Sequence, residues 1–189
     1  MRIVQLHVTI YLGINQKKSK SIYEGNKTMN YRMTNMNENI VKEIATWKYG
    51  GEYSVYNTES FEDLKARNAH IVNPTKSNNY ICYFSDENKL IAYTNITKKD
   101  NGVIFLGIGL APIFCGKGLG KYILENSIEE VKKRYSDGKI ALQVRSWNIR
   151  AIKCYEKTGF KNLKCEVIED HNGEKAEFVF MEYNIKSNV

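Results

Sequence analysis

A glycine-rich turn is the first feature of this sequence with the residue types needed to bind a ligand. Cys115-Gly116-Lys117-Gly118-Leu119-Gly120 follows an apolar stretch at 102–110 and a proline, Pro112, and it precedes a sequence with helical periodicity. Glycines allow backbone N–H groups to converge on an anion without obstruction by Cβ atoms. The first turn of the following helix adds unpaired N–H groups and a partial positive charge. The segment therefore predicts a phosphate-binding turn.

Two common nucleotide-binding patterns do not fit this turn. Lys117 lies between the glycines and no Gly-Lys-Ser/Thr follows, which excludes a Walker P-loop. The glycines at 116, 118 and 120 lack the dinucleotide spacing, and the next predicted strand ends at Val144-Arg145 without an acidic residue for a ribose. On this segment alone, a tight strand-to-helix turn without any ligand remains an alternative interpretation.

A second segment with a specific pattern begins near Asn148, about 28 residues after the glycine turn. Asn148 is a suitable N-cap for a helix at 150–158. Ala151 and Tyr155 are four residues apart, so they share one face of that helix. A small residue beside a tyrosine leaves room for a ligand next to the hydroxyl group. The alternative, for the tyrosine alone, is an ordinary core aromatic.

Together the two segments resemble the GCN5-related N-acetyltransferase (GNAT) family. The resemblance is strong from Gly102 to Phe160, looser in element order from Tyr31 to Asn184, and absent from residues 1–28. It implies an α/β (α+β) fold: a central mixed, mostly antiparallel sheet of about six to seven strands, flanked by about four helices. Two central strands splay into a V that holds the pantetheine arm of coenzyme A.

The resemblance also implies a reaction and a cofactor. The expected enzyme is an acyltransferase that moves the acetyl group of acetyl-CoA to a primary amine, on a small molecule or on a protein or peptide, by direct attack in a ternary complex. No metal is expected. Dimers are common in the family, so a homodimer is compatible with the sequence.

The resemblance assigns roles to particular residues. The backbone amide of Leu110 would face the thioester carbonyl, where a fixed N–H stabilises an oxyanion by a few kcal/mol. Tyr155 would be the general acid, since a tyrosine has a pKa of about 10 against about 8.5 for the leaving thiol. The implied cofactor-binding residues are Ile108, Gly109, Leu110, Cys115, Gly116, Lys117, Gly118, Leu119, Gly120, Lys121, Asn148, Ala151, Tyr155 and Lys157.

Two positions depart from the family pattern. The turn begins with Cys115 where the family usually has Arg or Gln, so a side-chain contact is lost. A thiol at a helix N-terminus can have a lowered pKa, which leaves an acyl-cysteine intermediate as an alternative to a packed thiol. Ribosomal-protein alanine acetyltransferases, which resemble this chain around Asn148, carry a Glu base where this sequence has Gln143. A CoA-binding regulatory module with weak catalysis is therefore the alternative function.

The general base and the acceptor pocket are less defined. The strand at 103–110 offers no carboxylate or histidine, whereas Glu52, Asp170 and His171 lie on predicted loops near the acceptor side. Aromatic faces there could hold a cationic amine, although a packed lid is an equal alternative. The residues expected to wall the acceptor pocket are Trp47, Tyr49, Glu52 and Tyr53.

Periodicity and turn residues predict the elements that position these groups. We expect one N-acetyltransferase domain at 29–189, preceded by an N-terminal arm at 1–28 outside the core. The arm combines strand-like alternation from Val4 to Leu12 with a polar stretch from Asn15 to Lys27, and it lacks the pattern of a signal peptide. The predicted strands are 31–33, 80–84, 89–96, 102–110, 139–145, 160–169 and 176–184. The predicted helices are 37–47, 61–68 and 150–158, together with one that opens at the glycine turn, has Leu124, Ile128, Val131 and Tyr135 on its apolar face, and ends before Gly138.

Composition limits the remaining classes. The chain has 189 residues, enough for one ordinary domain, and it contains no apolar run near the ~20 residues of a membrane span. Its four cysteines form no CxxC pair, which favours reduced thiols and a cytoplasmic location. The net charge of +7 suggests nucleic acid as a less favoured partner, but residues 117–164 alone hold a net +7. That distribution favours a phosphate-bearing cofactor.

Overall fold

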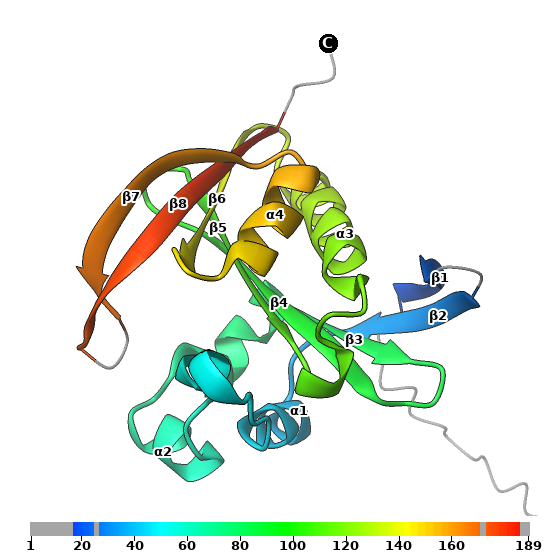
Figure 1. Cartoon of the computed structure of the whole chain (residues 1–189). Helices are drawn as coiled ribbons and strands as arrows, with labels where there is room; N and C mark the ends of the chain where they lie inside the picture. The colour runs from blue at the N-terminus through cyan, green and yellow to red at the C-terminus, as the bar shows by residue number, and fades with distance from the viewer. Residues whose placement is uncertain (1–16, 25–26, 171–172, 186–189) are drawn as a thin grey trace, which may run out of the picture.

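The computed structural model describes residues 17–24, 27–170 and 173–185 (Figure 1). Within these ranges the chain forms four α-helices and one eight-stranded sheet. The helices are α1 (Glu38–Ala45), α2 (Phe61–Ala66), α3 (Leu119–Arg134) and α4 (Ile149–Lys157). The strands are β1 (Lys17–Glu24), β2 (Lys27–Thr34), β3 (Tyr80–Ser85), β4 (Leu90–Lys98), β5 (Ile104–Leu110), β6 (Gly138–Arg145), β7 (Lys161–Glu169) and β8 (Lys175–Ile185).

The sheet has the mixed, mostly antiparallel topology expected from the sequence. Its order is β1-β2-β3-β4-β5-β6-β8-β7, and only the β5–β6 pair is parallel. The sheet exceeds the expected six to seven strands because Lys17–Glu24, expected to be a polar stretch, pairs antiparallel with β2. The boundary expected between residues 28 and 29 therefore falls inside β2, whereas the alternating segment from Val4 to Leu12 lies outside the described residues.

The core lies between the sheet and the helices. α3 packs Leu119, Ile123 and Leu124 into it, with less than 2% of each side chain's surface exposed. β3 is buried along its whole length, as its apolar sequence requires. β5 was expected to be buried on both faces as well, but only Ile104 and Leu106 are buried and the remaining residues are partly exposed. The sheet opens at that point.

The opening is a divergence of β5 and β6. The two strands pair only at Ile104↔Ile140 and Phe105↔Ala141, near the start of each strand. β6 instead pairs with β8 from Gly138 to Arg145, so its second half follows β8 away from β5 (Figure 1). The expected V between the two central strands is therefore present, and the C-terminal half of β5 forms one of its sides.

Candidate active site

The end of β5 presents backbone groups to the V. The amide of Ala111 donates to Ile91 O at 2.9 Å, so the facing residues Leu110 and Ala92 form a non-hydrogen-bonded pair. In such a pair the N–H and C=O point away from the partner strand. Tyr49 donates its hydroxyl to Leu110 O at 2.7 Å, which fixes the strand end. The N–H of Leu110 is thus directed into the V, because β6 no longer pairs with β5 there.

Aromatic side chains support this strand end from one face of the sheet. Tyr93 lies directly opposite Gly109, and a Cβ added at Gly109 would lie 2.5 Å from Tyr93 Cε1. Trp47 packs against the same ring with centroids 5.9 Å apart. Trp47 is itself buried in the core beside that ring. Burial raises the pKa of Tyr49, which keeps its hydroxyl protonated as a donor.

The glycine turn forms an open backbone cradle before α3. Gly116 and Gly118 have φ of 78° and 75°, a left-handed conformation that favours glycine. No side chain caps α3 at Gly118, and a Cβ added there would meet nothing within 4 Å. The N–H groups in the first turn of α3 therefore donate to no capping side chain. Leu119 is buried and anchors the turn to the core.

The lysines of the turn differ in their surroundings. The ammonium of Lys117 lies 5.7 Å from the centre of the Phe114 ring. Lys121 forms an ion pair with Glu125 at 3.7 Å, with about half of each side chain exposed. Lys157 is exposed in the last turn of α4, where its charge acts on the thiol of Cys154.

Cys115 is a packed thiol. Its Sγ lies 3.7 Å from both Leu110 O and Ala111 O. Burial raises the pKa of Cys115, and the opposing effect of nearby Arg150 is smaller. A lowered pKa, considered from the sequence, is therefore contradicted, because burial outweighs the positive charge. A neutral thiol is a poor nucleophile, and the structure does not favour an acyl-cysteine intermediate.

The start of α4 lies beside the V and the turn. Asn148 is 7% exposed, accepts from Ala151 N at 3.2 Å as the N-cap, and donates to the Tyr56 hydroxyl at 3.2 Å. A Cβ added at Gly120 would lie 3.5 Å from Cys154 Sγ, so α4 packs closely against the start of α3. The structure thus brings the Asn148 segment and the glycine turn together, as their sequence pattern indicated.

Tyr155 projects from the same helix and is partly buried against the core. Burial raises its pKa above the ordinary value, with smaller contributions from Cys154 and Tyr56. Within the described chain, no side chain or backbone group hydrogen-bonds to its hydroxyl. The hydroxyl is therefore protonated at neutral pH and free to donate to another group.

An aromatic cluster covers the start of α4. It comes from the 3₁₀ helix η1 (Gly51–Tyr56), whose Tyr53 and Tyr56 pack on Trp147 with centroids 5.3 and 5.9 Å apart. Tyr53 also carries the guanidinium of Arg150 over its ring, at 4.8 Å from the centroid. Tyr53, which the sequence predicts to wall the acceptor pocket, therefore contacts Trp147 just before α4 and Arg150 in its first turn. Glu52, in the same segment, is exposed.

Asp170 is engaged in a buried ion pair and is not a free base. Its carboxylate pairs with the guanidinium of Arg145, and their side chains are 4% and 8% exposed. Asp170 also accepts from Glu174 N at 3.0 Å, and Arg145 lies over the Phe178 ring at 4.6 Å. The pair ties the β7–β8 hairpin to the end of β6. His171, the other predicted loop candidate, lies outside the described residues.

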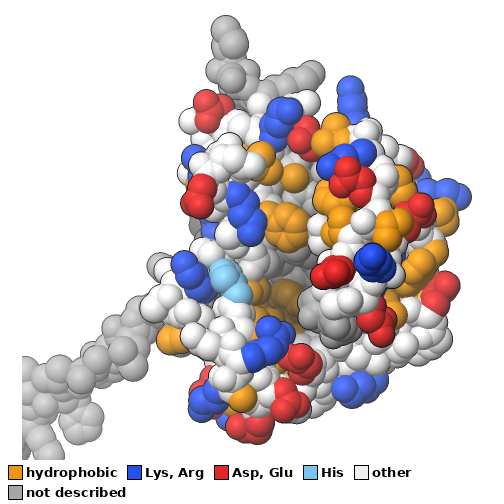
Figure 2. Space-filling model, turned by 90° about the vertical axis from the view of Figure 1, so that its left-hand side faces the viewer, with side chains coloured by type: hydrophobic (Ala, Val, Ile, Leu, Met, Phe, Trp, Pro, Cys, Tyr) orange, Lys and Arg blue, Asp and Glu red, His pale blue; other side chains and the backbone are white. Residues whose placement is uncertain are grey.

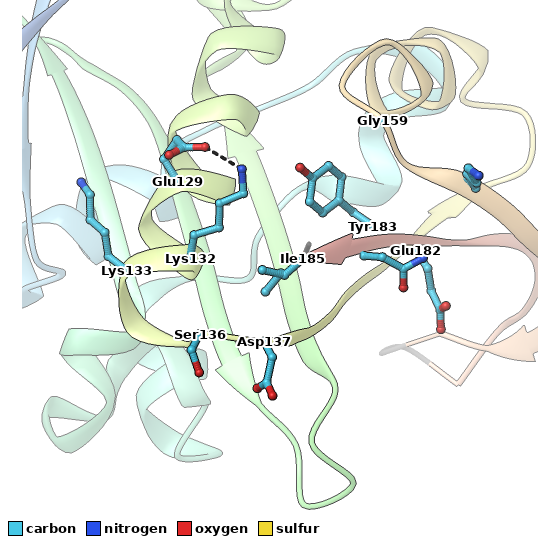
Figure 3. Close-up of a pocket in the computed structure, with 11 residues that line it drawn as sticks. Glu129, Lys132, Lys133, Ser136, Asp137, Gly159, Glu182, Tyr183 and Ile185 are labelled. Atoms are coloured by element: carbon cyan, nitrogen blue, oxygen red, sulfur yellow. Dashed lines mark hydrogen bonds and ion pairs between the residues drawn. The ribbon is translucent and has the colours of Figure 1, made fainter. Parts of the chain in front are cut away.

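Two further hollows lie on the surface of the described structure. Viewed from the side of α2 and the β7–β8 hairpin, the molecule has a hollow with hydrophobic side chains at its floor and charged side chains around its rim (Figure 2). A separate cavity of about 970 Å³ lies between the end of α3, the start of β7 and the end of β8, away from the V (Figure 3). Its lining mixes both charges, including the Glu129–Lys132 ion pair.

The described residues contain neither a membrane-spanning helix nor a metal-binding cluster. None of the helices there combines the length and apolar character needed to cross a bilayer. Within the same ranges, no group of three or more His, Cys, Asp or Glu side chains is arranged to hold a metal ion.

Comparison with solved structures shows the same fold in known acetyltransferases. Spermidine N-acetyltransferase SpeG from Vibrio cholerae, in complex with CoA and spermine, superposes with a TM-score of 0.64 at 18% identity, covering 82% of this chain and 95% of that one. Ribosomal-protein-S5-alanine acetyltransferase from Vibrio fischeri gives a TM-score of 0.61 at 16% identity, covering 89% and 97%. No curated protein sequence matches this chain.

The family is established by the sequence itself. Residues 40–160 match the profile of the Acetyltransferase (GNAT) family. That range begins in α1 and ends after α4, so it includes both sides of the V, the glycine turn and the Asn148 segment. The chain therefore belongs to the GNAT acetyltransferase family, and it is an acyltransferase.

Proposed function

We propose that this enzyme transfers the acetyl group of acetyl-CoA to a primary amine, on a small molecule or on a protein or peptide, by direct attack. The observation that carries this proposal is the V, with the N–H of Leu110 directed into it and protonated Tyr155 on the adjoining helix. Hydrogen-bond donors for a developing oxyanion and for a leaving thiolate are the two groups that such a transfer needs.

The donor set fits coenzyme A. The cradle at Gly116 and Gly118 offers backbone N–H groups at the positive end of α3, and Lys117 adds a charge. These groups would hold the diphosphate, whereas Asn148 would hydrogen-bond an amide of the pantetheine arm. When bound, the cofactor supplies an acetyl group activated as a thioester.

The protein residues have separate tasks in this proposal. The N–H of Leu110 donates to the thioester carbonyl oxygen as negative charge develops there. Tyr49 keeps that N–H in place by holding the carbonyl of the same residue. Tyr155 donates its hydroxyl proton, or a hydrogen bond, to the departing sulfur. Asp170 is held in an ion pair with Arg145, and β5 offers no carboxylate or histidine, so we assign proton removal from the amine to water.

The pH dependence should reflect Tyr155 in its protonated form. Because burial raises its pKa, the active protonated form persists at every pH below the ordinary value of about 10. We expect kcat/KM to rise with pH as the amine deprotonates and not to fall again below about pH 10. Initial rates of thiol release across this range, corrected for spontaneous thioester hydrolysis, test this. A descending limb near pH 8 would contradict the role of Tyr155.

Thiol release also separates catalysis from mere cofactor binding. The protein is incubated with acetyl-CoA and a panel of amines that includes a polyamine, a lysine peptide and a peptide with a free N-terminus. Amine-dependent release of free CoA supports the enzyme. Tight binding of acetyl-CoA without release for any amine favours the regulatory module, for which Gln143 in place of a carboxylate is the motivating observation.

We further propose that the N-terminal arm is dispensable for catalysis. β1 pairs only with β2, at the edge of the sheet separated from β5 by three strands. Deleting residues 1–26 removes β1 and leaves β2 complete. We expect unchanged kcat/KM for acetyl-CoA and a lower melting temperature, because the edge of β2 loses its partner. A folded but inactive truncation would contradict this proposal.

A cytoplasmic location is the remaining proposal from the sequence. All four cysteines are free, including the exposed Cys165 and the partly buried Cys115 and Cys154. Free thiols at accessible positions suit a reducing compartment.

A further inference from the structure

We propose that Arg150 is a side-chain ligand for the phosphates of acetyl-CoA, held ready for them by Tyr53. The proposal rests on the proposed function, because it assumes that the glycine turn receives the cofactor's phosphates. Its basis is the position of one cation that forms no ion pair with a carboxylate in the described part of the chain.

The guanidinium of Arg150 reaches the glycine turn although Arg150 belongs to α4. Its Nη1 lies 4.0 Å from the position of a Cβ added at Gly116. It also interacts with the thiol of Cys115. Cys115 itself points its Sγ inward, toward Leu110 O and Ala111 O, so the first residue of the turn offers no charged side chain. Arg150 is the charged group that occupies this place.

Electrostatics makes the position unfavourable without an anion. Arg150 is in the first turn of α4, where the helix dipole repels a cation, and it lies beside the start of α3, where a second dipole does the same. Lys117 adds a third positive element in the turn. Within the described residues no carboxylate forms an ion pair with Arg150. A bound diphosphate or 3′-phosphate is negatively charged, so it would attract Arg150, Lys117 and both helix N-termini.

Tyr53 explains how the guanidinium is kept in place. The ring lies 4.8 Å from the guanidinium carbon and is itself packed edge-on against Trp147. Stacking on an aromatic face restricts an exposed arginine and leaves its N–H edge free to donate. In this proposal Tyr53 is therefore a positioning residue for the cofactor side of the V.

The test compares ligands with and without phosphates. Binding of acetyl-CoA, 3′-dephospho-acetyl-CoA and acetyl-pantetheine is measured by calorimetry, and kcat/KM is measured with acetyl-CoA and with acetyl-pantetheine. Arg150→Ala should raise the Kd for acetyl-CoA roughly tenfold, as expected for one charge-assisted hydrogen bond. It should leave kcat/KM with acetyl-pantetheine unchanged, and Arg150→Lys should recover part of the affinity. If Arg150→Ala weakens the binding of 3′-dephospho-acetyl-CoA as much as that of acetyl-CoA, Arg150 contacts the diphosphate. If it weakens the binding of acetyl-CoA alone, Arg150 contacts the 3′-phosphate.

A matched control removes a cation elsewhere. Lys161→Ala deletes one exposed positive charge at the start of β7 and should bind acetyl-CoA as the parent protein does. The proposal is overturned if Arg150→Ala binds acetyl-CoA normally, or if it loses acetyl-pantetheine turnover to the same degree, which would indicate a structural role. Failure of the parent protein to bind acetyl-CoA would instead overturn the proposed function.

Discussion

Replacing Tyr155 with phenylalanine should lower kcat about 100-fold while leaving the Kd for acetyl-CoA nearly unchanged. The substitution keeps the ring, which packs against Phe160 with centroids 6.1 Å apart, and removes only the hydroxyl. No described group depends on that hydroxyl for a hydrogen bond, so its loss should not disturb the fold. An interaction made only as the thiolate leaves contributes to kcat and not to ground-state binding. Thiol-release kinetics and calorimetry together measure both quantities.

A matched tyrosine separates the catalytic effect from a general one. Tyr135 follows α3 at the end away from the V, where Lys98 lies over its ring at 5.2 Å. Tyr135→Phe makes the same chemical change and should retain full kcat. If Tyr155→Phe weakens binding and turnover equally, the hydroxyl has a structural role and the proposed general acid is wrong.

Local sequence signals predicted the parts of the site that short segments determine. The glycines of the turn need positive φ, and an asparagine before a helical sequence is a cap; both are properties of a few neighbouring residues. The end of β5 could be predicted as well, because Pro112 cannot continue a strand ladder. These signals, combined in chain order, carry the resemblance to the GNAT family, and the resemblance in turn implied the V.

Contacts between distant segments could not be predicted in the same way. The hydrogen bond between Asn148 and Tyr56 joins residues 92 apart in the sequence. The stacking of Arg150 on Tyr53 joins α4 to a 3₁₀ helix whose aromatic residues suggested only an acceptor wall. The pairing of Arg145 with Asp170 likewise turned a predicted loop base into a structural ion pair. In each case tertiary packing, not residue type, decides the partner.

The same reasoning applies to the close packing at Gly109, which local sequence does not reveal although the family resemblance places Gly109 at the cofactor. An apolar strand with two glycines suggests only a buried strand, and nothing local distinguishes Gly107 from Gly109. The structure distinguishes them sharply. A Cβ added at Gly109 would lie 2.5 Å from Tyr93 Cε1 and 2.9 Å from Cζ, whereas one added at Gly107 would lie 3.6 Å from Asn95 Cβ, an ordinary contact.

Gly109→Ala should therefore destabilise the protein by about 1–3 kcal/mol, the usual cost of overpacking. The Tyr93 ring cannot retreat easily, because it is held between Trp47 and Tyr80 with centroids 5.9 and 6.4 Å away. For a chain of this size each kcal/mol corresponds to roughly 2–4 °C in Tm, so thermal unfolding followed by circular dichroism resolves the effect. Gly107→Ala, the control on the same strand, should change Tm little.

A double mutant tests whether the ring is the cause. Tyr93→Leu removes the atoms that the new methyl group would strike, so the additional cost of Gly109→Ala should be smaller in that background than in the parent protein. Equal costs in both backgrounds would show that the strand needs glycine for another reason. Because Gly109 precedes the residue whose N–H faces the V, displacement of β5 in the single mutant should also lower kcat. Gly109→Ala should therefore lower both stability and kcat, whereas Gly107→Ala should change neither.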